Sequence, residues 1–155
     1  VLGGASSSVA EANLVARRDQ AMNNALQAAL ASTAVGPDEV GFLHAHGLST
    51  RTGDMEEAWA INQVFGCRSS PVPVVAAKSH FGNLGAASGM VELVAGVMAL
   101  VHNRLFPVLN YETPDPDCPV WVVTDGSVPP GRGFVNLSVT PQGQASVAVI
   151  AAFTG

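Results

Sequence analysis

At 155 residues, the chain is expected to form a single domain, residues 1–155, with a substantial hydrophobic core. Hydrophobic residues make up 48% of the chain and charged residues only 12%, which excludes a disordered protein and favours a surface partly covered by another protein. Twelve acidic residues against seven basic ones give a net charge of −5, and the lack of a basic stripe makes nucleic acid a poor candidate partner.

The first third of the chain predicts a strand, a helix and a second strand. The opening VLGGASSS is typical of a strand end followed by a loop, and it has no basic region before an apolar stretch, so we expect no signal peptide. Apolar residues recur at helical spacing over residues 20–33. A Gly-Pro break separates this helix from a short apolar strand, VGFLHAH, and from the loop GLSTRTGD that follows it.

The next predicted helix covers MEEAWAINQVFG. We expect Asp54 to cap its start, because Glu57 at the third helical position could complete a capping box. Gly66 is expected to end the helix. The β-branched run VPVVAA then predicts another strand.

A long apolar helix is predicted over residues 84–101, after the turn that holds Lys78, the only lysine of the chain. The helix carries Glu92 near its middle and is rich in small residues. We therefore expect a central, sandwiched helix and no membrane span.

The last third of the chain begins with an irregular stretch. Residues 106–132 contain six prolines, with a short strand predicted at VWVV. Two closing strands, GFVNLSV and ASVAVIAAF, are joined by TPQGQ. The whole order of elements predicts an α/β fold with a mixed sheet.

Two polar loops follow strands, where functional groups of α/β folds gather. His46 in the first loop could donate a hydrogen bond or shuttle a proton. In the second, Lys78 could orient a carboxylate, and the amide of Asn83 could donate to a developing oxyanion or cap the following helix. We expect the two loops to converge on one small site.

The two cysteines, Cys67 and Cys118, stand alone without CxxC spacing. This argues against a zinc site or a disulfide framework and favours a reducing, cytoplasmic compartment. His44 and His80 could join His46 around a metal, but no carboxylate or thiolate completes such a set. We therefore expect neither a metal nor another cofactor.

Two motifs resemble those of the β-ketoacyl synthases, condensing enzymes of the thiolase superfamily. LHAHGLSTRTGDMEEAWAI is similar to the family signature AHGTxTxxGDxxEA, and KSHFGNLGAASG is similar to KSNxGHxxxAAG. The resemblance covers essentially the whole chain but only the carboxyl-terminal half of such an enzyme. It implies a thiolase-like half whose mixed sheet is layered with helices, including a central buried helix. The activity that it implies is decarboxylative Claisen condensation of acyl and malonyl thioesters in fatty-acid or polyketide synthesis.

The resemblance also implies roles for individual residues. His46 matches the histidine that contacts the thioester carbonyl and assists decarboxylation, and Lys78 matches the family lysine. Glu57 matches the buried glutamate that pairs near this lysine, and Asp54 matches the aspartate of GD. Thr50 matches the second threonine of the substrate-facing loop. The nucleophilic cysteine of the family lies in the amino-terminal half and is not expected in this chain.

The chain also departs from the family pattern. Asn83 stands where chain-elongating enzymes have a second histidine, as in the Cys-His-Asn enzymes that start chains, and His80 stands where asparagine is usual. An amide offers an N–H to an oxyanion as an imidazole does, but it cannot transfer a proton.

The predicted substrate-facing positions depart as well. Leu48 replaces the first threonine of the loop, and Val139 takes the place of a gating phenylalanine. Gly143 lies in the segment that replaces the glycine-rich gate of the family.

The implied partners are an amino-terminal ketosynthase half, in the same or a separate chain, and an acyl carrier protein with its phosphopantetheine thioester. A dimeric assembly is also implied. Two other functions stay open. One is a ketosynthase-like partner subunit without condensing activity, with a structural or decarboxylating role, which the altered TPQGQ segment favours; the other is an unrelated binding module.

Overall fold

The computed structural model describes residues 1–152. Its strands and helices follow the predicted order, except that the turn predicted after the third strand contains a short helix, α3. The bounds are β1 (Gly3–Ser8), α1 (Arg18–Thr33), β2 (Phe42–His44), α2 (Arg51–Phe65), β3 (Pro73–Val75), α3 (Lys78–Phe81), α4 (Ser88–Val101), β4 (Trp121–Val122), β5 (Gly133–Val139) and β6 (Gln144–Ala151). Short 3₁₀ helices lie at Pro37–Glu39 and Gly85–Ala87.

The strands of the described residues form one mixed sheet in the order β1-β6-β5-β2-β3-β4. β2 pairs in parallel with β5 and with β3, and β3 pairs in parallel with β4. β6 is antiparallel to both β5 and β1. The predicted α/β class with a mixed sheet is confirmed. Since β5, β2 and β3 run in the same direction, their carboxyl ends meet at one edge, with β2 in the middle.

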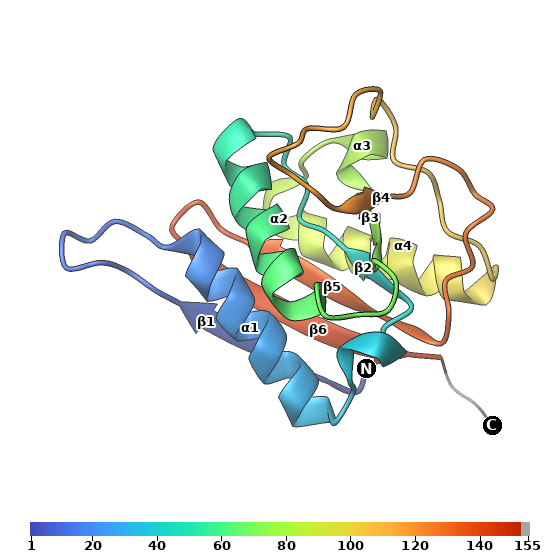
Figure 1. The fold of residues 1–155 in the computed structure, drawn as a ribbon, viewed down its shortest axis with the longest axis horizontal. Coiled ribbons are helices and arrows are strands. Elements are labelled where there is room, and N and C mark those ends of the chain that lie inside the picture. The colour runs from blue at the N-terminus through green and yellow to red at the C-terminus, as the bar shows by residue number, and fades with distance from the viewer. Residues whose placement is uncertain (153–155) are drawn as a thin grey trace.

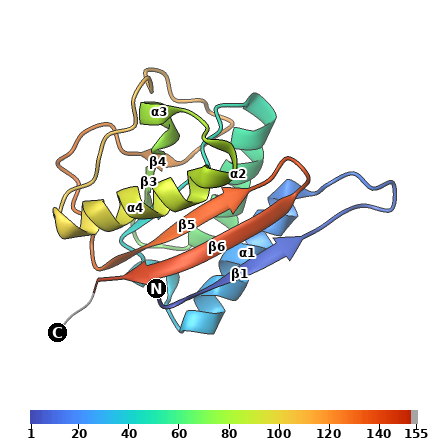
Figure 2. The same cartoon turned by 180° about the vertical axis from the view of Figure 1, so that it is seen from behind.

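Helices cover the two faces of this sheet unequally. Figure 1 shows α1 and α2 in front of the sheet, and Figure 2 shows α4 on the other side, across β5. Successive residues of β2 point to opposite faces. Leu43 therefore joins the core beneath α1 and α2, whereas Phe42 joins the core beneath α4.

Helix α4 approaches the sheet closely at Gly96. A Cβ at this position would lie 2.4 Å from the ring of Phe134, so only glycine fits at this contact. The Phe134 ring stacks on that of Phe42, with centroids 4.8 Å apart. The other side of α4 is bare: Met90 is 65% exposed and Val101 70%. In the part of the chain that the structure describes, no helix covers β6 and β1 on this side of the sheet (Figure 2).

Two predicted helix starts are wrong. Helix α2 begins at Arg51, with Thr50 as its N-cap and no capping bond from the Thr50 side chain, so Asp54 lies inside the first turn and is not the N-cap. The helix predicted from residue 84 begins only at Ser88, because Gly85 adopts a positive φ of 61° and residues Gly85–Ala87 form a 3₁₀ helix.

Two other boundaries agree with the sequence: Gly66 ends α2 as predicted, and β4 lies within VWVV. The opening does not, because residues expected to form a loop after a strand end belong to β1, Gly3–Ser8, which pairs with β6 along its whole length. In the part of the chain that the structure describes, no helix is long and apolar enough to cross a membrane.

Candidate functional site

The carboxyl ends of β2, β3 and β5 bring His46, Lys78 and Val139 together. His46 follows β2, Lys78 begins α3 just after β3, and Val139 ends β5. Lys78 Nζ donates to the carbonyl oxygen of His46 at 2.6 Å and lies 3.3 Å from His46 Nδ1. The backbone nitrogen of Val139 lies 3.5 Å from the same Nδ1. Three neighbouring strands thus hold one imidazole ring.

These contacts fix the tautomer of His46. Both groups that face Nδ1 are N–H donors, so Nδ1 accepts and the neutral ring carries its hydrogen on Nε2. Burial, followed by the positive charge of Lys78, lowers the pKa of His46 from 6.5 to about 4. The ring is therefore neutral near pH 7 and presents one N–H as a donor.

Glu57 anchors the backbone of the same loop. Its carboxylate, from α2, accepts hydrogen bonds from the backbone N–H groups of His46 at 2.6 Å and Gly47 at 3.0 Å. Burial raises the pKa of Glu57 to about 7, against the effect of these two donors. A Cβ on Gly47 would lie 2.7 Å from that of Ala76, so glycine is needed for this close approach. The predicted capping box is wrong, because Glu57 bonds the β2 loop and not the start of its own helix.

The carboxylate paired with Lys78 is Glu92, which sequence reasoning did not assign to the site. The two side chains form an ion pair and are 4% and 0% exposed. Ser138 Oγ lies 3.4 Å from the second carboxylate oxygen. The pairing corrects the expectation that Glu57 is the partner of the lysine. A signal was present in the sequence, since Glu92 is the single carboxylate of an apolar helix and needs a cation when buried.

Asn83 lies in an exposed turn between α3 and α4. Its carbonyl oxygen accepts from Gly85 N and Ser88 Oγ, both at 3.0 Å. Since Gly85 N is a donor, the amide oxygen faces it, and both hydrogen bonds of the Asn83 side chain within residues 1–152 are made by this oxygen. Asn83 does not cap α4, whose N-cap is Ala87. Convergence of Asn83 with His46 stays a prediction, because no hydrogen bond joins them among the described residues.

A cavity of about 350 Å³ opens beside His46. Leu48, Thr50 and Val139, three of the predicted substrate-facing residues, line it. Asp54 lines it too; burial raises the pKa of its carboxyl group, and one of its oxygens lacks a hydrogen-bond partner.

Gly143, the fourth residue expected to face the substrate, lies elsewhere. It has a φ of 86°, and a Cβ there would lie 2.5 Å from that of Ala16. The cavity beside His46 is lined by other residues. Gly143 therefore lies where the β5–β6 turn packs against the loop before α1.

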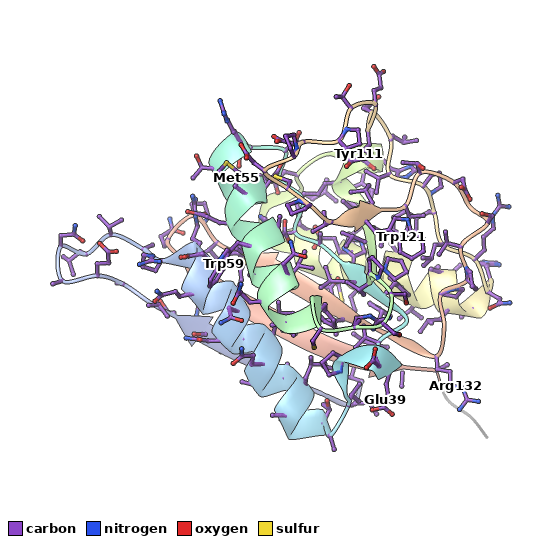
Figure 3. The ribbon with its side chains drawn as sticks, in the orientation of Figure 1. Glu39, Met55, Trp59, Tyr111, Trp121 and Arg132 are labelled. Carbon is purple, nitrogen blue, oxygen red and sulfur yellow. The ribbon has the colours of Figure 1, made fainter. Side chains whose placement is uncertain are left out.

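A second cavity, of about 310 Å³, lies on the other side of the α2 start. Tyr111, labelled in Figure 3, and Cys118 contribute to it from the proline-rich segment. Arg51, Asp54 and Glu57 line both cavities, but His46 lines only the first. The first cavity is therefore the candidate active site.

Comparison with known sequences identifies the family. The model of the β-ketoacyl synthase C-terminal domain matches residues 1–112, and the chain belongs to this family.

Curated relatives agree with this assignment. The chain is 41% identical over 87 residues to polyketide synthase GfsA of Streptomyces halstedii, covering 56% of this chain and 1% of that protein. It is 34% identical over 101 residues to 3-oxoacyl-[acyl-carrier-protein] synthase 2 of Staphylococcus aureus, covering 65% and 25% respectively. The chain thus spans a quarter or less of these relatives.

Solved structures give the same result for the fold. The ishigamide ketosynthase/chain length factor matches with a TM-score of 0.90 and 29% identity, over 99% of this chain and 38% of that one. A type II polyketide synthase acyl-carrier protein in complex with its ketosynthase bound to the hexaketide, AntDE:AntF, matches with a TM-score of 0.86 and 31% identity, over 99% and 38%. The predicted thiolase-like ketosynthase fold is confirmed.

Proposed function

We propose that residues 1–155 form one domain, the carboxyl-terminal half of a condensing enzyme of the β-ketoacyl-[acyl carrier protein] synthase type. The reaction is decarboxylative Claisen condensation of acyl and malonyl thioesters. The observation that supports it is the arrangement around His46, whose Nδ1 faces donors from two other strand ends and whose Nε2 hydrogen is left to donate.

In this reaction the malonyl thioester first loses carbon dioxide, and the electron pair of the broken bond becomes an enolate. His46 Nε2–H and Asn83 Nδ2–H stabilise the enolate oxygen, since preorganised donors act most strongly where charge develops. The enolate carbon attacks an acyl thioester carried by a cysteine, and the cysteine thiolate leaves. Lys78, paired with Glu92, acts as a positioning residue because its donor bonds hold the loop of His46.

The cysteine belongs, in this proposal, to an amino-terminal half that packs on the bare side of α4. The apolar residues exposed there need cover from another surface; they are Met90, Val94, Val97, Met98 and Val101. The assembled protein, meaning this chain with that half, is proposed to be a dimer. The reducing cytoplasm suits its free thiols at Cys67 and Cys118.

The substrate in this proposal reaches the cavity on the phosphopantetheine arm of an acyl carrier protein. The cavity beside His46 has the apolar Leu48 and Val139 and the hydroxyl of Thr50 in its walls, which suits an arm of mixed polarity. The type II relative found with its acyl-carrier protein supports this class of partner.

A ketosynthase-like partner subunit without condensing activity is the second candidate. The observation in its favour is the β5–β6 turn, where Thr140, Pro141 and Gln142 stand in place of the flexible, glycine-rich gate of the family. Thr140 N donates to Gln144 O, and Gly143 N donates to Thr140 O, each at 2.9 Å. A turn closed by these bonds and by Pro141 has fewer accessible conformations than a glycine-rich gate.

Malonyl-carrier turnover by the assembled protein separates these functions. Carbon dioxide release together with a new carbon–carbon bond would support the condensing enzyme. Release without condensation would support the partner subunit as a decarboxylase. If neither occurs and His46→Ala behaves as the parent does, the proposed condensing function is contradicted.

A further inference from the structure

His44 is a polar side chain buried within the apolar core at the end of β2. It is 0% exposed, and it stands directly before Ala45, the residue that matches the first position of the family signature AHGTxTxxGDxxEA. Its Nδ1 lies 3.1 Å from the carbonyl oxygen of Ala45, and the backbone N–H of Ala77 donates to its Nε2 at 3.3 Å. The neutral ring therefore carries its hydrogen on Nδ1 and accepts at Nε2, so both ring nitrogens are used.

The bond to Ala77 joins the two loops of the candidate site. The β2–β3 ladder ends where Ala45 N donates to Val75 O at 2.8 Å. Beyond this point the side chain of His44 accepts the next available N–H, that of Ala77. Ala45 directly precedes His46, and Ala77 directly precedes Lys78. One imidazole ring thus extends the pairing of two strands as far as the two residues of the site.

The surroundings keep this ring neutral. Phe106 packs against it with centroids 5.9 Å apart, and His80 lies on Phe106 at 5.7 Å with its Nε2 2.7 Å from the carbonyl oxygen of Pro107. Burial, followed by the charge of Lys78, lowers the pKa of His44 to about 4. A protonated ring would turn an N–H toward the N–H of Ala77 and lose that bond.

We propose that His44 is a positioning residue: its Nε2, by accepting from Ala77, holds Lys78 against His46. The kinetic consequence rests on the function proposed above, whereas the effect on the ionisation of His46 does not. If the bond is lost and Lys78 recedes, the positive charge that helps to lower the pKa of His46 becomes weaker. The pKa of His46 is therefore a measure of the position of Lys78.

Two amide substitutions separate the two bonds of the ring. In His44→Gln the side-chain oxygen can reach the place of Nε2 and accept from Ala77. In His44→Asn the shorter side chain reaches only the place of Nδ1, so it keeps the bond to the carbonyl oxygen of Ala45 and loses the bond from Ala77. His44→Phe keeps the ring and loses both bonds. Leu30→Ala serves as the control, because Leu30 is a buried core residue of α1 outside both loops and both cavities.

The pKa of His46 is followed by NMR in the assembled protein with labelled histidine, alongside malonyl decarboxylation. We expect His44→Asn and His44→Phe to raise the pKa of His46 by about half a unit or more and to slow decarboxylation at least about tenfold. His44→Gln and Leu30→Ala should leave this pKa where it is. Equal pKa values in all variants, or an equal rise in His44→Gln, would overturn the proposal.

A measurement without substitution applies even where a variant fails to fold. In the parent protein, an N–H···N bond between Ala77 and His44 Nε2 should give a coupling between their nitrogen nuclei, lost as His44 is protonated. Absence of the coupling at neutral pH would overturn the proposal. If the assembled protein shows the coupling and the pKa pattern but turns over no malonyl thioester, the proposed function fails and the positioning role of His44 stands.

Discussion

The two proposed donors, His46 and Asn83, are held in different ways. His46 receives contacts from α2, α3 and β5, from residues that lie 11, 32 and 93 positions away in the sequence. Among the hydrogen bonds of residues 1–152, Asn83 is held only by Gly85 and Ser88, within five residues of itself, and it is exposed. The fold of this chain therefore fixes the first donor, whereas a local turn orients the second.

The two donors of the proposed site are therefore positioned by different kinds of contact. Long-range contacts from a packed sheet place His46 before any partner arrives. Asn83 has a defined amide orientation, but its turn is exposed. If the amino-terminal half proposed above covers this turn, the site is completed only when the two halves assemble.

The largest effect is expected from Lys78→Met, which removes the firmest support of His46. Glu92 would remain buried without its cation, and breaking a buried pair from one side costs about 3–5 kcal/mol of unfolding free energy. Urea unfolding of the assembled protein measures it. The double variant Lys78→Met/Glu92→Leu should regain most of the stability but not the decarboxylation. A single variant as stable as the parent would contradict the structural role of the pair.

Asn83→Ala tests the loosely held donor. We expect malonyl decarboxylation to fall about a hundredfold or more, since loss of one oxyanion donor costs about 3–4 kcal/mol. Asn83→His should be tolerated because an imidazole also offers an N–H. Ser88→Ala, which removes one of the two contacts on the amide oxygen, should have a smaller effect of the same kind. Equal turnover in Asn83→Ala and the parent would show that Asn83 only forms a turn.

Glu57→Gln tests the backbone support of His46. An amide has one accepting oxygen, so the N–H of His46 or Gly47 loses its partner, at a cost of about 1–3 kcal/mol. The folded-state pKa of Glu57 is raised from 4.5 to about 7. Its contribution to stability is thus present below pH 4.5 and lost as the pH rises to 7. The free energy of unfolding of the parent should therefore fall as the pH rises from 4.5 to 7, and in Glu57→Gln this fall should be absent. The same pH dependence in both proteins would contradict the raised pKa of Glu57.

Pro141→Gly should have the smallest effect. The glycine gives the turn between β5 and β6 more conformational freedom. Val139, whose backbone N–H contacts His46, directly precedes this turn. Stability should fall by about 0.4–1 kcal/mol, and hydrogen exchange in residues 139–144 should become faster, with decarboxylation nearly unchanged. A parent turn that already exchanges as fast as the variant would show that it is a mobile gate after all.

The sequence predicted the elements well where periodicity and breakers agree, as over residues 20–33 and at Gly66. It failed at the start of α2, because the extended backbone of Thr50 begins that helix and no side chain caps it. It missed the pairing of Lys78 with Glu92, since that contact depends on how α4 crosses the sheet. His46 and Lys78 could be named from their motifs, but their mutual geometry needed the strand order.

A structure of the assembled protein with an unreactive malonyl-thioester analogue would show whether His46 and Asn83 share one site. We predict that His46 Nε2 and Asn83 Nδ2 both lie about 3 Å from the same analogue oxygen, and therefore no more than about 6 Å from each other. The two side chains pointing to opposite sides of the sheet edge, or Asn83 bonding only within its own turn, would contradict the shared site.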